Sequence, residues 1–184
     1  MRPGQPPLSL KARALAYLSA REHSRSELRA KLLRPVLPKP QRGSAPQAEG
    51  LDPYLENSRA SEQGMEQAAS VDVVLDELEA LKYLSDERFV ESLAHRRASR
   101  FGVLKLRHEL KSHKIAEPLL KEVIERARSS ELERAIEVWS KKFVALPESA
   151  EDRARQQRFL ANRGFTPSVV YKVLKGRVSD EDYE

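Results

Sequence analysis

Apolar residues recur at intervals of three and four positions in a series of short segments, the pattern of amphipathic helices. The pattern is clearest in the middle of the chain. It predicts three consecutive helices there, at residues 85–100, 103–113 and 118–126. Ser85 suits an N-cap, Gly102 breaks the chain after the first helix, and Pro118 suits the first turn of the third. We therefore expect residues 85–127 to form one three-helix unit.

The same pattern continues on the N-terminal side of this unit. One helix is expected up to about Arg21. A second opens where Ser24 and Glu27 have the spacing of a capping box. A third is expected to begin at Ser70 or Asp72, whose side chains suit an N-cap.

Residues 35–70 interrupt the apolar pattern. They contain five prolines and three glycines, and many of the other residues are Ser, Gln and Ala. This composition predicts a disordered insertion within the first unit. A partner-binding segment around Leu51–Leu55 is the alternative interpretation.

A further set of helices is predicted on the C-terminal side. Trp139 shares a helical face with Leu132 and Phe143, so we expect it to pack in a core rather than to stack on a nucleic-acid base. Ser149 suits the N-cap of the next helix, and Gly164 suits its C-terminal stop. Thr166 and Pro167 then suit the start of the last helix.

The chain also repeats internally with a period of fifty residues. Leu110 aligns with Leu160, Ile115 with Phe165, and Val123-Ile124 with Val173-Leu174. A period of this size predicts an all-α fold built as a tandem array of three three-helix repeats, elongated and curved. The expected units are residues 1–84, 85–127 and 128–177, followed by an acidic tail at 178–184. Such an array with polar ends is expected to be a monomer.

Charge is distributed in blocks along the chain. From Ser92 to Lys114 there are seven Lys and Arg and one acid, and from Arg153 to Arg177 there are seven and none. The last seven residues carry four acids, which could shield a basic face. The cationic blocks predict a basic surface that contacts a polyanion or an acidic protein groove; solvated faces without a partner are the alternative. Ten residues are the candidate contacts: Arg96, Arg97, Arg100, Arg107, Lys111, Lys114, Arg153, Arg155, Arg158 and Arg163.

Catalytic and cofactor chemistry finds little support in the sequence. Phosphate-loop, dinucleotide, nucleophile-elbow and HExxH patterns are absent, so we expect no enzyme, no cofactor and no metal site. The lack of cysteine excludes disulfides and favours a reducing cytoplasm. No apolar run is long enough to span a membrane, and the first residues do not form a secretory signal.

Five segments together resemble the RecX family, the bacterial regulators of the RecA recombinase. They are residues 23–32, 83–89, 100–102, 106–110 and 158–165. The chain departs from the family pattern in two places. Lys114 stands where such sequences usually have glycine, so that turn is expected to be built differently, and the insertion at 35–70 is unusually long.

The resemblance implies a regulator that lies in the groove of the RecA–DNA filament. It implies inhibition of RecA recombinase, ATPase and coprotease activity, in DNA repair and the SOS response. Contacts to single- or double-stranded DNA would be independent of sequence. The alternative is a stand-alone basic helical module that binds DNA without a protein target.

Overall fold

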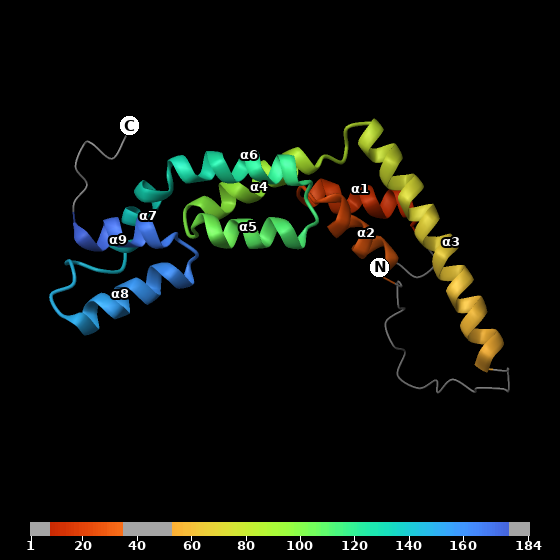
Figure 1. Ribbon diagram of the computed structural model, residues 1–184. Helices are drawn as coiled ribbons and strands as arrows, with labels where there is room; N and C mark the ends of the chain where they lie inside the picture. The colour runs from red at the N-terminus through yellow and green to blue at the C-terminus, as the bar shows by residue number, and fades with distance from the viewer. Residues whose placement is uncertain (1–7, 35–52, 177–184) are drawn as a thin grey trace, which may run out of the picture. The chain divides into compact units, whose positions relative to one another are not determined.

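The computed structural model describes residues 8–34 and 53–176, with the main chain alone for 53–62 (Figure 1). All regular structure in these residues is helical, which confirms the all-α prediction. The helices are α1 (Leu10–Ala20), α2 (Arg25–Leu33), α3 (Pro53–Ala80), α4 (Asp86–Ala98), α5 (Val103–Ser112), α6 (Glu117–Ser129), α7 (Glu131–Ser140), α8 (Ala150–Asn162) and α9 (Pro167–Lys175). They belong to two compact units, residues 1–85 and 86–184.

The first unit packs α1 and α2 against the C-terminal half of α3. Its buried residues are Ala14, Leu28, Leu32, Val71, Leu75, Leu78 and Leu84. Ser24 begins α2 as predicted, because its hydroxyl accepts a hydrogen bond from the Glu27 main-chain N–H at 3.1 Å. The Glu27 carboxylate bonds to Arg21 and lies 3.2 Å from the Lys31 ammonium, which ties the turn before α2 to its first two turns.

Helix α3 begins at Pro53. The prediction of disorder is therefore wrong for residues 53–70, and so is the predicted helix start at Ser70 or Asp72. The segment is rich in good helix formers and has one interior glycine, Gly64, which costs about 1 kcal/mol relative to alanine. Residues 63–70 are almost all exposed, so they carry no apolar stripe that would reveal a helix. Residues 35–52 lie outside the described residues. They include the first two residues of the possible partner-binding segment, and the other three belong to α3.

The second unit contains two three-helix repeats, α4–α6 and α7–α9, each with its own apolar core. The first core includes Phe89, Leu93, Leu106, Leu110, Leu120 and Val123. The second includes Ala135, Val138, Leu160, Phe165, Val170 and Leu174. Trp139 packs against the second core and donates from Nε1 to Gln156 Oε1 at 2.7 Å, so its predicted core role is confirmed. The exact unit boundaries at 84, 127 and 177 remain a prediction.

The two repeats of the second unit meet main chain to main chain. The Gly102 N–H donates to the Arg163 carbonyl at 2.9 Å, and the Leu104 N–H donates to the Gly164 carbonyl at 2.9 Å. A Cβ atom on Gly102 would lie 2.4 Å from the Gly164 carbonyl oxygen, and one on Gly164 would lie 2.5 Å from the Lys105 nitrogen. Glycine at both positions is what allows the α4–α5 and α8–α9 turns to approach this closely.

Two charged side chains of α7 complete this junction. Glu131 is 2% exposed and accepts hydrogen bonds from the Val103 N–H at 2.9 Å, the Thr166 N–H at 3.2 Å and the Thr166 hydroxyl at 2.9 Å. Glu131 thereby caps the starts of α5 and α9 together, where a negative charge suits both helix dipoles.

Arg134 binds helix ends of the opposite polarity. Its guanidinium donates to the carbonyls of Ala98 at the end of α4 and Phe101 just after it, and to those of Ala127 and Ser130 at the end of α6. Burial lowers the pKa of Arg134, and the negative charge of Glu131 opposes this effect. The Glu131–Arg134 pair therefore holds four helix ends in one place.

The turn at Lys114 corrects one expectation. Lys114 has φ of +55°, in the same left-handed region as Gly164 at +78° in the next repeat. Its N–H donates to the Lys111 carbonyl at 3.0 Å, just as the Gly164 N–H donates to Ala161 at 2.9 Å. The turn is built in the same way despite the missing glycine, at a cost of about 1 kcal/mol.

Candidate nucleic-acid and partner interface

The candidate cations all lie in the second unit, in three groups. Arg96 and Arg97 are on the last turn of α4, and Arg100 follows it. Arg107 and Lys111 lie one turn apart on α5, and Lys114 follows in the next turn of chain. Arg153, Arg155 and Arg158 are on α8, and Arg163 is its C-cap.

Arg97 holds α4 to α5. Its Nη2 lies 2.6 Å from Glu109 Oε1 and its Nε lies 2.9 Å from Glu109 Oε2, a two-pronged contact. Hydrogen bonding to Glu109 raises the pKa of Arg97. Its charge is thus compensated within the protein, whereas Arg96 and Arg100 are exposed and make no contact with a carboxylate in the described part of the chain.

The α5 group is the least compensated of the three. Arg107 approaches Glu117 only at 3.9 Å, and both side chains are largely exposed. Lys111 and Lys114 are exposed, and neither forms an ion pair within residues 8–34 and 63–176. A weak exposed pair of this kind contributes little to stability. Arg107, Lys111 and Lys114, which we call the α5 stripe, therefore present nearly their full charge to solvent.

Two cations of the α8 group lie beside aromatic rings. Arg155 pairs with Asp152 at 2.8 Å and lies 6.0 Å from the Phe143 ring centre. The Arg163 guanidinium lies 3.9 Å from the Phe159 ring centre. Arg153 and Arg158 are exposed, and no carboxylate of the described residues pairs with them.

The sequence pattern missed two further cations. Lys105 lies 4.3 Å from the Phe101 ring centre, beside Arg97 and Arg100 at 5.8 and 5.7 Å. Lys142 lies 5.5 Å from the Phe159 ring centre. Lys105 does not share the helical spacing of Arg107, Lys111 and Lys114, and Lys142 follows a helix assigned to the core. Spacing alone therefore does not reveal that they join the cationic groups.

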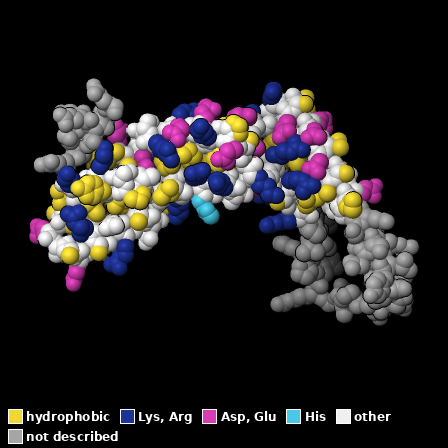
Figure 2. Space-filling model, viewed as in Figure 1, with side chains coloured by type: hydrophobic (Ala, Val, Ile, Leu, Met, Phe, Trp, Pro, Cys, Tyr) yellow, Lys and Arg dark blue, Asp and Glu magenta, His cyan; other side chains and the backbone are white. Residues whose placement is uncertain are grey.

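Six residues of the third repeat line a hollow of about 650 Å³, which we call the α8 hollow. They are Lys142, Phe143, Arg155, Arg158, Phe159 and Asn162. The face drawn in Figure 2 has dark-blue and yellow side chains next to one another over α8 and α9. The hollow therefore combines cationic walls with aromatic surface.

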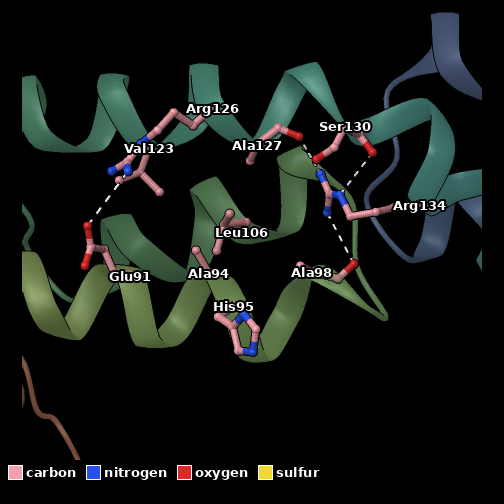
Figure 3. Close-up of a pocket in the computed structure, with 10 residues that line it drawn as sticks. All are labelled: Glu91, Ala94, His95, Ala98, Leu106, Val123, Arg126, Ala127, Ser130 and Arg134. Atoms are coloured by element: carbon pink, nitrogen blue, oxygen red, sulfur yellow. Dashed lines mark hydrogen bonds and ion pairs between the residues drawn. The ribbon is translucent and has the colours of Figure 1, made fainter.

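A second hollow, of about 300 Å³, lies among α4, α5, α6 and α7 (Figure 3). Its walls are mainly apolar, from Ala94, Ala98, Leu106, Val123 and Ala127, with Glu91, His95, Arg126, Ser130 and Arg134 around them. Arg134 is held on main-chain carbonyls, and Arg126 lies 3.8 Å from Glu91 in a weak, exposed pair. The lining of this hollow therefore includes a carboxylate, whereas the six residues that line the α8 hollow include none.

The cations of α2 in the first unit face the acids of α3. Arg25 lies 2.7 Å from Asp76 and 2.6 Å from Glu79, and Arg29 lies 2.7 Å from Asp72. Hydrogen bonding to Arg29 lowers the pKa of Asp72. These arginines hold α2 on α3, so their charge is compensated within the first unit.

The described residues contain no group of three His, Asp or Glu side chains placed to hold a metal ion. Among the described helices, none is both long enough and apolar enough to cross a membrane.

Comparisons with known proteins agree with this architecture. Residues 85–124 match the model of the RecX second three-helix domain, and residues 129–174 match that of the RecX third three-helix domain. The chain is 42% identical to a Regulatory protein RecX of Ralstonia nicotianae, over 92% of this chain and 89% of the relative. It is 41% identical to that of Leptothrix cholodnii over 100% of this chain and 98% of the relative. The α4–α6 and α7–α9 repeats and this similarity over nearly the whole length lead to one conclusion: the chain belongs to the RecX family of regulatory proteins.

Proposed function

We propose that this protein binds the RecA–DNA filament and inhibits the recombinase, ATPase and coprotease activities of RecA, in DNA repair and the SOS response. Its relatives carry the name Regulatory protein RecX, and the repeats of the second unit present cations that the described part of the chain does not neutralise. The observation that carries the proposal is the α5 stripe, where Lys111 and Lys114 are exposed without an ion pair among the described residues. We further propose that the protein acts as a monomer in the cytoplasm.

Physical arguments support a filament groove as the target. Exposed cations that no described carboxylate compensates can replace the counterions condensed on DNA phosphates, and the release of those counterions favours binding. Contacts with phosphate carry no sequence information, so the protein would bind filaments on any DNA. Three-helix repeats joined by a rigid junction hold such cations at fixed separations along one body.

ATP hydrolysis by RecA on single-stranded DNA tests the proposal. Titration of this protein into RecA-coated single strands is expected to stop hydrolysis at amounts well below one copy per RecA protomer, because one copy in the groove affects the assembly of many protomers. Unchanged hydrolysis at one copy per protomer would contradict the proposal. Inhibition that appears only when the DNA itself becomes saturated would favour the stand-alone DNA-binding module.

A further inference from the structure

We propose that the α8 hollow is a binding site for one unpaired nucleotide of a single strand. Lys142 and Arg158 would contact the phosphate, and the rings of Phe143 and Phe159 would contact the sugar and base. The inference rests on the proposed function only in taking nucleic acid as a partner. It adds Lys142, Phe143, Phe159 and Asn162 to the interface and selects a single strand as the form recognised.

The charge in the hollow fits an anion. Asp152 pairs with Arg155 at 2.8 Å and compensates one cation. Lys142 and Arg158 are exposed, and neither pairs with a carboxylate among the described residues. Arg163 adds a further positive charge at the Phe159 ring. A phosphate entering the hollow would therefore meet at least two cations whose charge is still available.

The aromatic surface favours nucleic acid over an acidic peptide. Phe143 and Phe159 meet edge to face, with ring centres 5.2 Å apart, and both are only partly buried. Ring surface beside cations is the arrangement that single-strand-binding proteins use, because every base has an apolar face and every nucleotide a phosphate. A carboxylate side chain would use the cations alone and would gain nothing from the rings.

The shape of the site favours a single strand. A volume of about 650 Å³ lies within the range of pockets that enclose small ligands. An unpaired nucleotide can turn its base and sugar into such a space. The bases of an intact duplex remain stacked inside the helix, so a duplex would reach the cations through its phosphates alone. Asn162 on the rim offers an amide that both donates and accepts hydrogen bonds.

Binding of fluorescently labelled oligothymidine, read by anisotropy, tests the cations. The double variant Lys142→Gln, Arg158→Gln is expected to raise the Kd about tenfold. It should also reduce the slope of log K against log salt by about 0.7, because the two cations share one phosphate and each phosphate that a protein neutralises on a single strand accounts for about 0.7 of that slope. The matched control is Lys121→Gln, Arg128→Gln on α6, which removes the same charge from exposed positions outside the hollow. Equal loss of affinity in the two double variants would overturn the proposal.

A second variant tests the rings. Phe143→Leu keeps apolar volume but removes one ring, and it is expected to weaken oligothymidine binding about fivefold without changing the salt slope. Tyr171→Leu is the control, since Tyr171 is an exposed ring beside Lys175 on α9, outside the hollow. The unfolding temperature of each variant is measured beside the wild type, and affinities are compared at a temperature where all are folded. An unchanged Kd in Phe143→Leu would overturn the assignment of the rings.

Two further ligands test whether the α8 hollow prefers a single strand to a duplex or an acidic peptide. Duplex DNA of the same length and a polyglutamate peptide are titrated under the same conditions, and both should bind more weakly than the single strand and respond less to Phe143→Leu. Stronger binding of either one in the hollow would overturn the choice of a single strand. RecA ATP hydrolysis is measured separately: a wild type that binds single strands through the hollow without inhibiting RecA would contradict the proposed function and leave this inference intact.

Discussion

His23 is the most constrained titratable residue of the first unit. Its side chain is buried, with Nδ1 2.9 Å from the Arg21 carbonyl and Nε2 2.7 Å from the Lys31 ammonium. Because a carbonyl only accepts and an ammonium only donates, Nδ1 carries the proton and Nε2 accepts. Burial lowers the pKa of His23, while the hydrogen bond to Arg21 and the charge of Glu27 oppose this effect. The neutral imidazole is therefore the form that the fold selects.

This selection predicts a pH-dependent stability of the first unit. His23 binds a proton more readily in the unfolded chain, with an ordinary pKa of 6.5, than in the folded protein. Stability should therefore be full above pH 6.5 and should be lost as the pH falls through the lower, folded pKa. Urea unfolding followed by the amide NMR signals of α1 and α2 measures it.

Two comparisons isolate the contribution of His23. His23→Gln should remove the pH dependence in this window, while His108→Gln, at an exposed position of α5, should keep it. Glu27 does not interfere: although burial raises its pKa, hydrogen bonds from Arg21 and Lys31 lower it below 4.5, so its window lies at lower pH. A pH dependence that persists in His23→Gln would show that another group is responsible.

Individual side-chain roles were only partly predictable from the sequence. The Ser149 N-cap and the Gly164 stop follow from local preference and are confirmed. Arg97 and Arg158 are alike in the sequence as members of basic blocks, yet Glu109 compensates the first and no described residue compensates the second. Which acid reaches which arginine depends on how helices pack, and helical spacing within one element does not encode that.

At the scale of helices, prediction succeeded where an apolar stripe exists. Helices α5, α6 and α9 have strong apolar faces. The predicted ranges of α5 and α6 differ from the observed ones by a few residues, and α9 begins at Pro167 as predicted. The N-terminal part of α3 has no such stripe, since residues 63–70 lie almost entirely in solvent. Without an apolar face, helix propensity alone indicates a helix only weakly. The prolines and glycines of the preceding segment therefore led to a prediction of disorder for residues 53–70.

The junction between α4–α6 and α7–α9 depends on Glu131. Its carboxylate satisfies two main-chain N–H groups and one hydroxyl in a buried place. These groups belong to Val103 and Thr166, at the starts of one helix from each repeat. Glu131 therefore couples the two repeats more directly than apolar packing alone would.

Replacing Glu131 by alanine is expected to destabilise the second unit by about 2–4 kcal/mol, because two N–H groups would be left buried without a partner. The two repeats should then unfold in separate steps. Trp139 fluorescence reports the third repeat, and the NMR signals of α5 report the middle one. Glu133→Ala, at an exposed position of the same helix, is the control and should change stability little. One cooperative transition with an unchanged midpoint in Glu131→Ala would refute this role of the carboxylate.

For the molecule as a whole, net charge is a poor guide to the interface. The chain carries a formal charge of +5, and its basic residues occur in both units. On α2, Arg25 and Arg29 pair with acids of α3, whereas the cations of α5 and α8 are mostly exposed. Blocks of charge were visible in the sequence, but the pairing that compensates Arg25 and Arg29 required α3, which the sequence did not reveal at its full length.

The exposed charge of the α5 stripe predicts how this protein binds the RecA filament. Changing Arg107, Lys111 and Lys114 together to Gln should weaken binding to RecA-coated single strands. If all three contact phosphate, the salt slope should also fall by about 2. The control is Lys121, Arg126 and Arg128 to Gln on α6, which removes the same charge. Equal affinity of both triple variants for the filament, measured by surface plasmon resonance at two salt concentrations, would mean that the stripe is a solvated face.

The contact between Gly102 and Gly164 has a consequence for how this sequence can change. The atoms that a new Cβ would strike belong to the main chain, apart from the Cβ of Lys105, and no rotamer change moves any of them. A substitution at either glycine therefore has no compensating partner elsewhere in the junction. Gly102 and Gly164, sixty-two positions apart, must therefore be kept together in evolution. A relative that replaces either glycine would lose this main-chain contact, and with it the fixed separation between the cations of α5 and those of α8.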